Sequence, residues 1–196
     1  MVGRPRSIDR EAVLDAAQAV AARDGAGQLT LESVAAEAGI SKASVLYDYK
    51  TKQALLKALV ERRIATESNR IEGIEQHLGP VPNVAIRARL SSELQELSDE
   101  DRKVALGLCA VVSQDADLRR PVQDMFTQRI AHLMETSEKP RGPLLAFLAV
   151  EGLKSLEWLG LYKWPSEERK RLLSEIRWLV DQEPEERACD EVTDSP

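Results

Sequence analysis

The chain has 196 residues, of which 43% are apolar and 31% charged, and its formal net charge is −6. This composition is typical of a globular, helix-rich protein, and with only two cysteines it excludes both a disordered chain and a disulfide scaffold. No apolar stretch approaches the ~18 residues of a membrane span and no secretory signal is recognisable, which predicts a cytoplasmic protein without a membrane partner.

A first helix is predicted before residue 25, because apolar residues recur at helical spacing from Val13 onward. Gly25 can end this helix. Arg4 and Arg6 precede it in the sequence. An arm with two arginines can enter the minor groove when it is joined to a DNA-binding domain, although it can also be a mobile terminus with incidental charge.

Two short helices separated by a tight turn are predicted next. Thr30 can cap a helix that ends at Gly39, and Ser41 can cap another that extends to about Tyr47. Two short helices joined by a Gly-containing turn form the helix-turn-helix motif, whose second helix lies in the major groove of DNA. Because similar pairs occur in helical proteins that bind no DNA, this pattern alone leaves both interpretations open.

Positive charge is concentrated around this helix pair. The first 63 residues carry ten Lys or Arg against eight Asp or Glu, whereas the remainder carries 17 against 25. Residues 41–57 hold four lysines, and Asp48 is their single acidic residue. Since nucleic acid attracts lysine and arginine, the local charge favours a DNA surface in a chain that is acidic as a whole.

A longer helix is predicted to begin after Thr51, which can cap it, and to end at Gly79 and Pro80. Lys52 lies in its first turn, where a positive charge opposes the helix dipole. A DNA phosphate facing Lys52 would offset that repulsion, which adds support for a DNA surface.

Residues 29–56, LTLESVAAEAGISKASVLYDYKTKQALL, resemble the DNA-binding domain of the tetracycline-repressor (TetR) family of bacterial transcriptional regulators. The resemblance extends over about residues 7–60 and rests on the Leu-Thr start, the Val-Ala pair, the Ala-Gly-Ile-Ser-Lys turn and the aromatic end of the second helix. It implies a double-stranded DNA operator as partner. The candidate DNA-binding residues are Arg4, Arg6, Thr30, Ser41, Lys42, Ala43, Ser44, Tyr47, Tyr49 and Lys52.

Four positions in this stretch depart from the family pattern. Leu46 stands at the usual first aromatic position and Tyr47 follows it, a variant that the family also shows. Ala43 stands where glycine is frequent, and its methyl group can contact a thymine methyl or simply pack. Tyr49 replaces phenylalanine, and we expect it to pack while its hydroxyl group reaches outward. Asp48 replaces a common histidine or tyrosine. Because phosphates repel a carboxylate, we expect Asp48 to pair with Lys50 or to face away from DNA.

The rest of the chain also predicts helices, at about residues 86–97, 104–112 and 118–133. The segment that follows Gly142 is apolar on nearly every side, and the last helix is expected to start after a Ser166 cap. The sequence thus predicts an all-α fold of about nine helices, a three-helix DNA-binding domain followed by a helical bundle.

The predicted organisation has three parts. They are a DNA-binding domain at residues 1–52 with its helix-turn-helix motif at 30–49, an effector-binding and dimerisation domain at 53–182, and an acidic tail at 183–196 that is expected to be disordered.

A homodimer is expected, because strongly apolar helices need a partner surface and the resemblance implies pairing through the last two helices. Two recognition helices ~34 Å apart can also read the two halves of a palindrome. The candidate interface residues are Leu153, Leu156, Leu172, Ile176 and Leu179.

The resemblance further implies a small-molecule effector, apolar or amphipathic, in the C-terminal domain. Met125, Phe126 and Trp158 are candidate pocket residues because they are bulky and adaptable, although they can equally be ordinary core residues. Cys109, in an apolar stretch, is expected to be a buried thiol.

These features predict a transcriptional repressor that an effector releases from a palindromic operator. An enzyme, a cofactor or a metal site is not expected, since no nucleophile with a base, phosphate loop or metal-ligand spacing is recognisable. The alternative is a helical adaptor or anti-repressor that kept the fold without DNA binding, motivated by Asp48 and the acidic net charge.

Overall fold

The computed structural model describes residues 10–94 and 98–184, and in these ranges the chain forms nine α-helices, one short 3-10 helix and no strand. The predicted all-α fold class is therefore confirmed. The elements are α1 (Arg10–Asp24), η1 (Ala26–Gln28), α2 (Leu31–Glu37), α3 (Lys42–Asp48), α4 (Lys52–Leu78), α5 (Val84–Ser92), α6 (Asp99–Gln114), α7 (Ala116–Glu135), α8 (Arg141–Trp158) and α9 (Ser166–Leu179).

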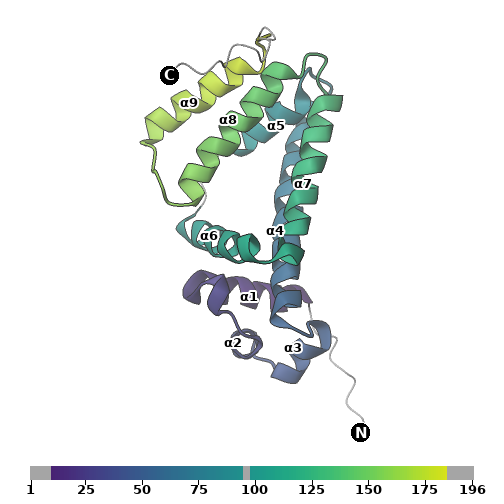
Figure 1. Cartoon of the computed structure of the whole chain (residues 1–196), viewed down its shortest axis with the longest axis vertical. Helices are drawn as coiled ribbons and strands as arrows, with labels where there is room; N and C mark the ends of the chain where they lie inside the picture. Colours follow the sequence, from purple (N-terminus) through teal and green to yellow (C-terminus); the bar gives the residue numbers. More distant parts are fainter. Residues whose placement is uncertain (1–9, 95–97, 185–196) are drawn as a thin grey trace, which may run out of the picture.

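Helices α1, α2 and α3 form one end of the molecule, next to the first turns of α4 (Figure 1). Their core contains fully buried side chains such as Val20, Val34 and Val45. Leu55 at the start of α4 and Val104 of α6 belong to the same apolar cluster. Because the cluster includes α4 and α6, the end formed by α1, α2 and α3 shares its core with these two helices.

The two short helices begin where capping residues predict. Thr30 accepts a hydrogen bond from the Ser33 backbone N–H, and Ser33 in turn accepts one from the Thr30 N–H, which makes a reciprocal capping box. Ser41 caps α3 in the same way by accepting from the Ser44 N–H. Between the helices, Gly39 has φ +65°, a left-handed conformation that side chains other than glycine rarely adopt. The turn therefore depends on this glycine.

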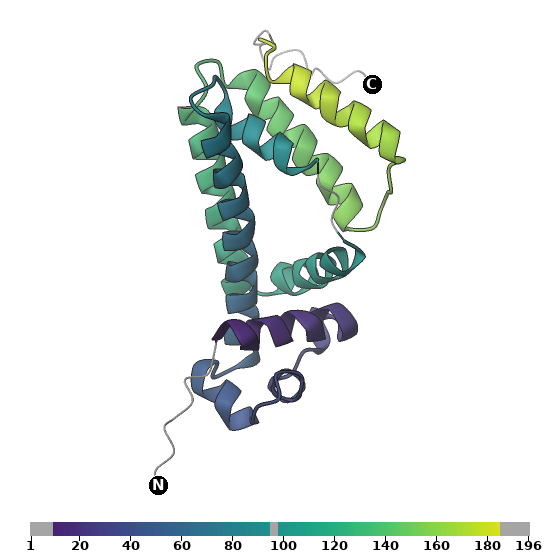
Figure 2. The ribbon, with the colours of Figure 1, turned by 180° about the vertical axis from the view of Figure 1, so that it is seen from behind.

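The C-terminal helices form a frame above this end. Helices α4 and α7 run side by side as a column, α6 lies across the top of α1, and α8 and α9 slant together away from the column (Figures 1 and 2). A second apolar cluster, which includes Ile86, Leu133, Phe147 and Leu173, holds α5, α7, α8 and α9 together. In the described part of the chain, none of the helices is long and apolar enough to cross a membrane.

Two predicted details of the helices are wrong. The fifth helix ends at Ser92 instead of continuing to residue 97, and Leu94 beyond it is 61% exposed, so it does not extend the apolar stripe; Leu97 lies outside the described residues. Ser166 is the first residue of α9 instead of its cap. Pro165 holds the cap position without a side-chain hydrogen bond, and a proline before the first turn supplies no donor that needs a partner.

The start of α8 packs closely beside the end of α9, so a methyl group added at Gly142 is predicted to lower the stability of the fold. In Gly142→Ala the added Cβ would lie 2.3 Å from the carbonyl oxygen of Gln182 and 2.8 Å from that of Leu179, so the backbone has to move. We expect a loss of ~1–3 kcal/mol in the free energy of unfolding, measured with urea. Gly73→Ala on α4 is the matched control. With no atom within 4 Å of its Cβ, it should stabilise by ~0.5–1 kcal/mol. Equal effects of the two substitutions would contradict this account.

Candidate nucleic-acid interface and internal cavity

Helix α3 presents one face to solvent and anchors the other in the core. Val45 is completely buried, whereas Ser41, Lys42 and Ala43 are exposed and the Tyr47 side chain is 77% exposed. The first turn of α3 also carries the backbone N–H groups and positive dipole end that suit a phosphate. The geometry therefore brings together four of the predicted DNA-binding residues on one accessible surface.

Lys42 already has an acidic partner on α2. Its ammonium group forms an ion pair with Glu32, and this hydrogen bond lowers the pKa of the Glu32 carboxyl below its usual value. Both side chains are half exposed, so solvent screens the pair and a phosphate can compete for Lys42. Glu32 therefore neutralises part of the charge of Lys42 in the uncomplexed protein.

Asp48 faces α1 instead of the exposed surface. Its carboxylate accepts a hydrogen bond of 3.0 Å from Nε of Arg10, and its side chain is only 7% exposed. The predicted pairing of Asp48 with Lys50 is thus wrong, because its partner is Arg10. A residue separated by 38 positions in sequence neutralises the carboxylate, so Asp48 places no free negative charge on the recognition surface.

Two predicted DNA contacts are occupied within the protein. Tyr49 is 8% exposed and belongs to the core, and burial raises the pKa of its hydroxyl group, so its ring packs as predicted but its side chain is not on the surface. Lys52 donates from Nζ to the carbonyl oxygen of Gly27, which holds the start of α4 against η1. Because the ammonium group of Lys52 has this partner, its unfavourable position at a helix start needs no DNA phosphate to explain it.

The remaining candidates divide between caps and surface. Thr30 and Ser44 are engaged in the caps of α2 and α3, while Arg4 and Arg6 lie outside the described residues. Lys50 is an exposed cation that is not among the predicted site residues. Lys50 lies with Nζ 5.5 Å from the centre of the Tyr47 ring, a cation–π distance that groups both side chains on the same surface. The cluster of lysines around Tyr47 was the sequence feature that could have identified it.

A cavity of about 260 Å³ lies between α4, α6, α7 and α8, and Met125, Phe126 and Trp158 all line it. The apolar part of the wall includes Leu108 of α6 and Ile64 of α4. Ligand pockets usually measure ~300–1,000 Å³, so this one suits a small ligand. The three residues predicted for an effector pocket are therefore brought together around one enclosed space.

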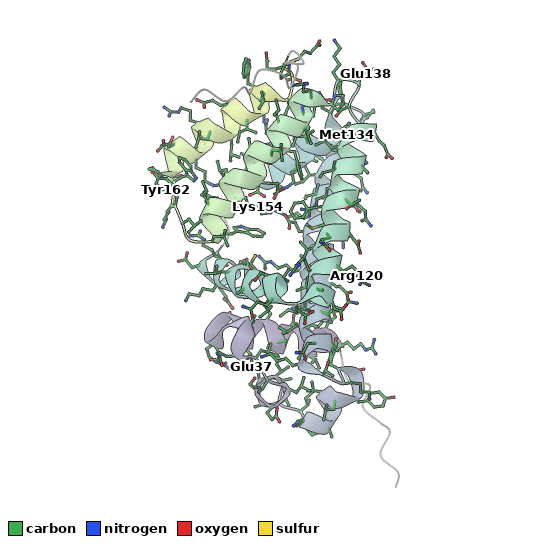
Figure 3. All side chains as sticks on the ribbon, viewed as in Figure 1. Glu37, Arg120, Met134, Glu138, Lys154 and Tyr162 are labelled. Carbon is green, nitrogen blue, oxygen red and sulfur yellow. The ribbon has the colours of Figure 1, made fainter. Side chains whose placement is uncertain are left out.

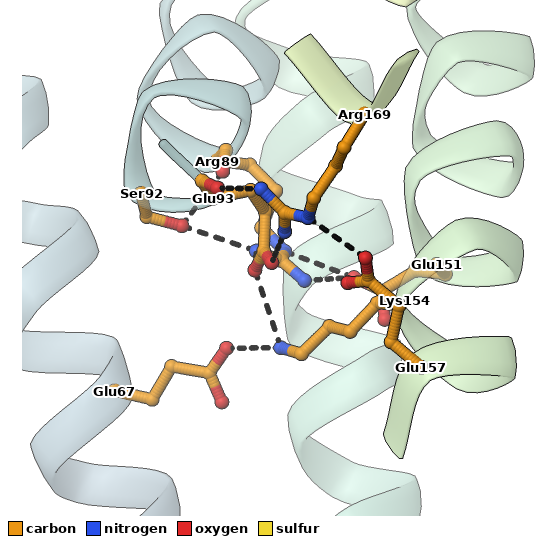
Figure 4. A network of polar contacts seen from close by, with 8 residues as sticks. All are labelled: Glu67, Arg89, Ser92, Glu93, Glu151, Lys154, Glu157 and Arg169. Carbon is orange, nitrogen blue, oxygen red and sulfur yellow. Dashed lines mark hydrogen bonds and ion pairs between the residues drawn. The ribbon is translucent and has the colours of Figure 1, made fainter. Parts of the chain in front are cut away.

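A network of charged groups borders this cavity (Figure 4). Arg89 of α5 donates to Glu151 of α8 at 2.9 and 2.7 Å and pairs with Glu93, while Lys154 of α8 donates to Glu67 of α4 at 2.6 Å. Arg169 of α9 extends the network to the Glu93 carbonyl and to Glu157. The network thus ties four helices together through side chains that are largely removed from water.

The buried acids of the network stay ionised because cations surround them. For Glu67, burial opposes ionisation, but the charges of Lys154, Arg89 and Arg129 outweigh it and lower the pKa from 4.5 to about 2. The pKa of Glu93 is lowered for the same reason, by Arg89 and Lys154 against the effect of burial. Each acid therefore favours the fold only in its charged form.

The thiol of Cys109 is not buried as predicted. It lies on α6 and is exposed, although partial burial raises its pKa above the usual value. Cys109 lines the cavity beside Leu108, so its exposed part faces that space. A raised thiol pKa gives little thiolate, so nothing here points to a reactive cysteine.

Helices α8 and α9 expose an apolar surface in the single chain. Leu145, Leu148, Leu156 and Leu159 recur along one side of α8 and are 38–58% exposed, and Trp178 of α9 is 65% exposed. Of the predicted interface residues, Leu156 lies on this surface. Leu172, Ile176 and Leu179 are partly buried, and the latter two pack on the second apolar cluster.

Leu153 departs from this pattern. It is only 6% exposed because it points into the chain's own core, so its side chain is already covered in a single protomer.

Comparison with known proteins places the chain in a family. Residues 13–59 match the family described as bacterial regulatory proteins, tetR family, and residues 83–181 match the one described as tetracyclin repressor-like, C-terminal domain. The chain belongs to the TetR family of transcriptional regulators. The family and fold are those of helix-turn-helix DNA-binding regulators and not those of enzymes.

One curated relative is YerO, an HTH-type transcriptional regulator of Bacillus subtilis strain 168. It is 26% identical over 98 residues, which cover 50% of this chain and only 34% of that protein. The match therefore spans about a third of the relative's length.

Solved structures share the fold at low identity. The regulator SCO7518 from Streptomyces coelicolor A3(2) has a TM-score of 0.69 and 18% identity, covering 88% of this chain and 98% of that one. A TetR-family regulator from Rhodococcus sp. has a TM-score of 0.65 and 23% identity, with 88% and 98% covered. The multidrug binding protein EbrR, solved with ethidium, has a TM-score of 0.65 and 18% identity, with 85% and 97% covered.

The lowered pKa of Glu67 predicts a loss of stability in acid. Because its folded pKa of about 2 lies below 4.5, the ionised group stabilises the fold above about pH 4.5, and this contribution disappears as the pH falls toward 2. The shift corresponds to on the order of 3 kcal/mol. Urea unfolding at several pH values should show that Glu67→Gln is much less stable than the unaltered protein near neutral pH and that the difference shrinks in acid.

Glu72→Gln is the control for this prediction, because Glu72 is an exposed carboxylate on the same helix. It should change stability little at any pH. A difference between Glu67→Gln and the unaltered protein that stays constant from neutral to acidic pH would contradict the assignment.

Proposed function

We propose that this TetR-family regulator represses transcription by binding a palindromic operator as a homodimer and that a small molecule in the internal cavity releases it. The observation that carries the DNA-binding part is the exposed face of α3, where Ser41, Lys42, Ala43 and Tyr47 are accessible while Arg10 neutralises Asp48. In this arrangement Lys42 and Tyr47 contact the operator, and Lys50 adds a phosphate contact beside them. Nothing in the described residues favours an adaptor without DNA binding.

The cavity supports the effector part of the proposal. It is enclosed by four helices, and its wall combines apolar side chains with a few charged groups, as ligand sites usually do. Structural neighbours with ligands include EbrR with ethidium and a regulator from Saccharomonospora viridis with choline. These are properties of those proteins, and for this chain the cavity itself carries the argument.

A short contact path connects the cavity with the DNA-binding end. Leu108 of α6 lines the cavity, and its neighbour Gly107 lies against η1, where an added Cβ would be 3.1 Å from the Ala26 nitrogen. A shift of α6 on ligand binding is therefore transmitted to η1, which Lys52 connects to α4. An effector acts in this way if it binds better to the arrangement of α6 that does not fit the operator.

The homodimer is supported by the exposed leucines of α8. They recur at intervals of three and eight residues, which returns them to one side of a helix, and α9, which carries the exposed Trp178, packs against α8. An apolar surface of this kind on two identical chains suits a self-complementary interface around a two-fold axis. Such a dimer would present two α3 helices to the two half-sites of a palindrome.

The experiment that tests DNA binding is selection of bound fragments from the source genome by the purified protein at near-physiological salt, followed by sequencing. Enrichment of a palindrome that is lost steeply as salt rises supports the proposal. If neither the protein as purified nor the protein refolded to remove a co-purified ligand enriches any sequence, the DNA-binding proposal is wrong.

Substitutions on α3 and α2 should change affinity for the selected palindrome in opposite directions. Lys42→Ala and Tyr47→Ala should each weaken binding. For Lys42→Ala we expect a loss of ~1–3 kcal/mol in the binding free energy if Lys42 contacts a base edge. Glu32→Gln should strengthen binding and steepen its salt dependence, because Glu32 competes with DNA for Lys42. Fluorescence anisotropy with labelled DNA measures all three.

The matched controls lie on α9, where Lys170 and Glu167 form an equivalent exposed pair at 2.9 Å. Lys170→Ala and Glu167→Gln alter charge by the same amounts but should leave DNA affinity nearly unchanged. If Glu32→Gln behaves like Glu167→Gln, the competition between Glu32 and DNA does not exist.

The dimer surface predicts a monomeric variant. Leu148→Asp places a charge on a leucine that is 58% exposed in the single chain and that the dimer would bury, so light scattering should report a monomer that no longer binds the palindrome. Leu106→Asp, at a 43% exposed leucine of α6 away from this surface, should remain dimeric. A dimeric Leu148→Asp protein would rule out this interface.

A further inference from the structure

The charges around the cavity differ in how closely they are paired. Five charged side chains line it, three cations and two acids, which gives the wall an excess of one positive charge. Both acids have close partners, since Glu151 accepts two hydrogen bonds from Arg89, which lies behind the wall, and Glu67 accepts one of 2.6 Å from Lys154. The two other cations of the wall, Arg63 and Arg129, have only more distant carboxylates.

Neither of these guanidinium groups has a carboxylate at hydrogen-bond distance among the described residues. Nη2 of Arg129 lies 3.7 Å from Glu67, and it is buried without any hydrogen-bond acceptor in the part of the chain that the structure describes. Nη1 of Arg63 lies 3.8 Å from Asp101, and its Nη2 donates only a long bond of 3.4 Å to the Asp101 carbonyl. A buried donor without an acceptor is unfavourable, so Arg129 favours an incoming oxygen anion, and the loosely held guanidinium group of Arg63 can supply further hydrogen bonds to it.

The aromatic side of the cavity disfavours a cation. Lys154 lies with Nζ 4.1 Å from the centre of the Trp158 ring, and Arg63 lies 5.7 Å from it. The negative faces of aromatic rings attract cations, but the protein's own cations already use this ring. A positively charged ligand would have to displace them and would also meet the excess positive charge of the wall.

Apart from Ser155 and Cys109, the rest of the wall is apolar. Val60 and Ile64 of α4, Leu108 of α6, and Val122 and Phe126 of α7 supply side chains without polar groups. A ligand that fits the whole cavity therefore has an apolar body and one anionic group.

From these observations we propose that the effector is a small amphipathic monoanion, a carboxylate with an apolar chain or ring system, whose carboxylate pairs with Arg129 and Arg63. The proposal rests on the effector function proposed above and names its ligand class. The carboxylate accepts hydrogen bonds from the two guanidinium groups, and the apolar body packs against α6 and α7. With a volume of about 260 Å³ the cavity suits a medium chain.

Three eight-carbon probes that differ in head group test this ligand class on the unaltered protein in the absence of DNA. They are octanoate, octanol and octyltrimethylammonium, and calorimetry together with tryptophan fluorescence measures their binding. We expect octanoate to bind at least about tenfold more tightly than octanol, a difference of ~1.4 kcal/mol, and the ammonium probe to bind most weakly. Equal or tighter binding of octanol or octyltrimethylammonium would overturn the proposal, as would no binding of hexanoate, octanoate or decanoate at millimolar concentration.

Two substitutions that change the charge of the cavity wall in opposite directions make the test more specific. Arg129→Gln should lose the preference for octanoate over octanol, whereas Glu67→Gln should increase it, because Glu67 competes for Arg129. Arg120→Gln, an exposed arginine on the same helix as Arg129, is the control and should keep the preference (Figure 3). A merely structural role for Arg129 would change all probes alike. If a variant does not fold, the three-probe comparison on the unaltered protein decides alone.

Adding the probes to the complex with the selected palindrome separates the two proposals. Octanoate that binds the free protein but leaves the DNA complex intact supports the ligand class and contradicts release by that class. Release by octanol or the ammonium probe, with no binding of octanoate, keeps the effector function and overturns the monoanion.

Discussion

The arrangement of the C-terminal helices depends on one buried network of ion pairs to which four helices contribute side chains. Glu67 of α4, Arg89 of α5, Lys154 of α8 and Arg169 of α9 approach one another from four directions, and each is largely removed from water (Figure 4). Removing charges from water costs several kcal/mol per ion, and only close partners offset it. Any shift of one helix that separates these groups leaves a buried charge unpaired. The network therefore specifies where the helices lie more than it adds to stability.

The same constraint explains why a cavity persists beside it. A fully apolar interior would close around empty space, but charged groups at fixed positions hold α4, α7 and α8 apart at one side while Phe126 and Phe147 pack edge-to-face farther along. About one turn before Glu67, α4 is fixed to α1 by Arg62, which donates to Asp15, Gln18 and the Leu14 carbonyl. The middle of α4 is thus held on one side by the charged network and on the other by α1, and the helix connects the cavity with the DNA-binding surface.

The parts of the fold that depend on local sequence could be predicted from it. Thr30, Ser41 and Thr51 cap the helices that they precede, because a cap needs only a side chain and a backbone N–H three residues later. The turn at Gly39 and the buried Val45 follow in the same way from spacing and backbone conformation.

The parts that depend on distant partners could not be predicted. For Asp48 the sequence indicates either a pair with the nearby Lys50 or a position facing away from DNA, but it gives no sign of the actual partner Arg10, 38 positions away. Lys154 likewise meets Glu67 across 87 positions. Lys52 shows the same limit, since its place in the sequence suggested a phosphate while the Gly27 carbonyl occupies it. Charge patterns in a sequence show how many ionic groups exist, but the packing of helices decides which of them meet.

The two weakly paired arginines give the ligand proposal a mechanical consequence. Arg63 joins α4 to Asp101 of α6, and Arg129 joins α7 to Glu67 of α4, each at a distance where the ion pair is loose. A carboxylate that binds both guanidinium groups competes with Asp101 and Glu67, so it weakens the contacts that hold α6 and α7 to α4. Because α6 also packs on η1 through Gly107, weakening its contact with α4 alters the support of the DNA-binding end. The ligand then interacts differently with the two arrangements of the protein, which is the condition that any effector has to meet.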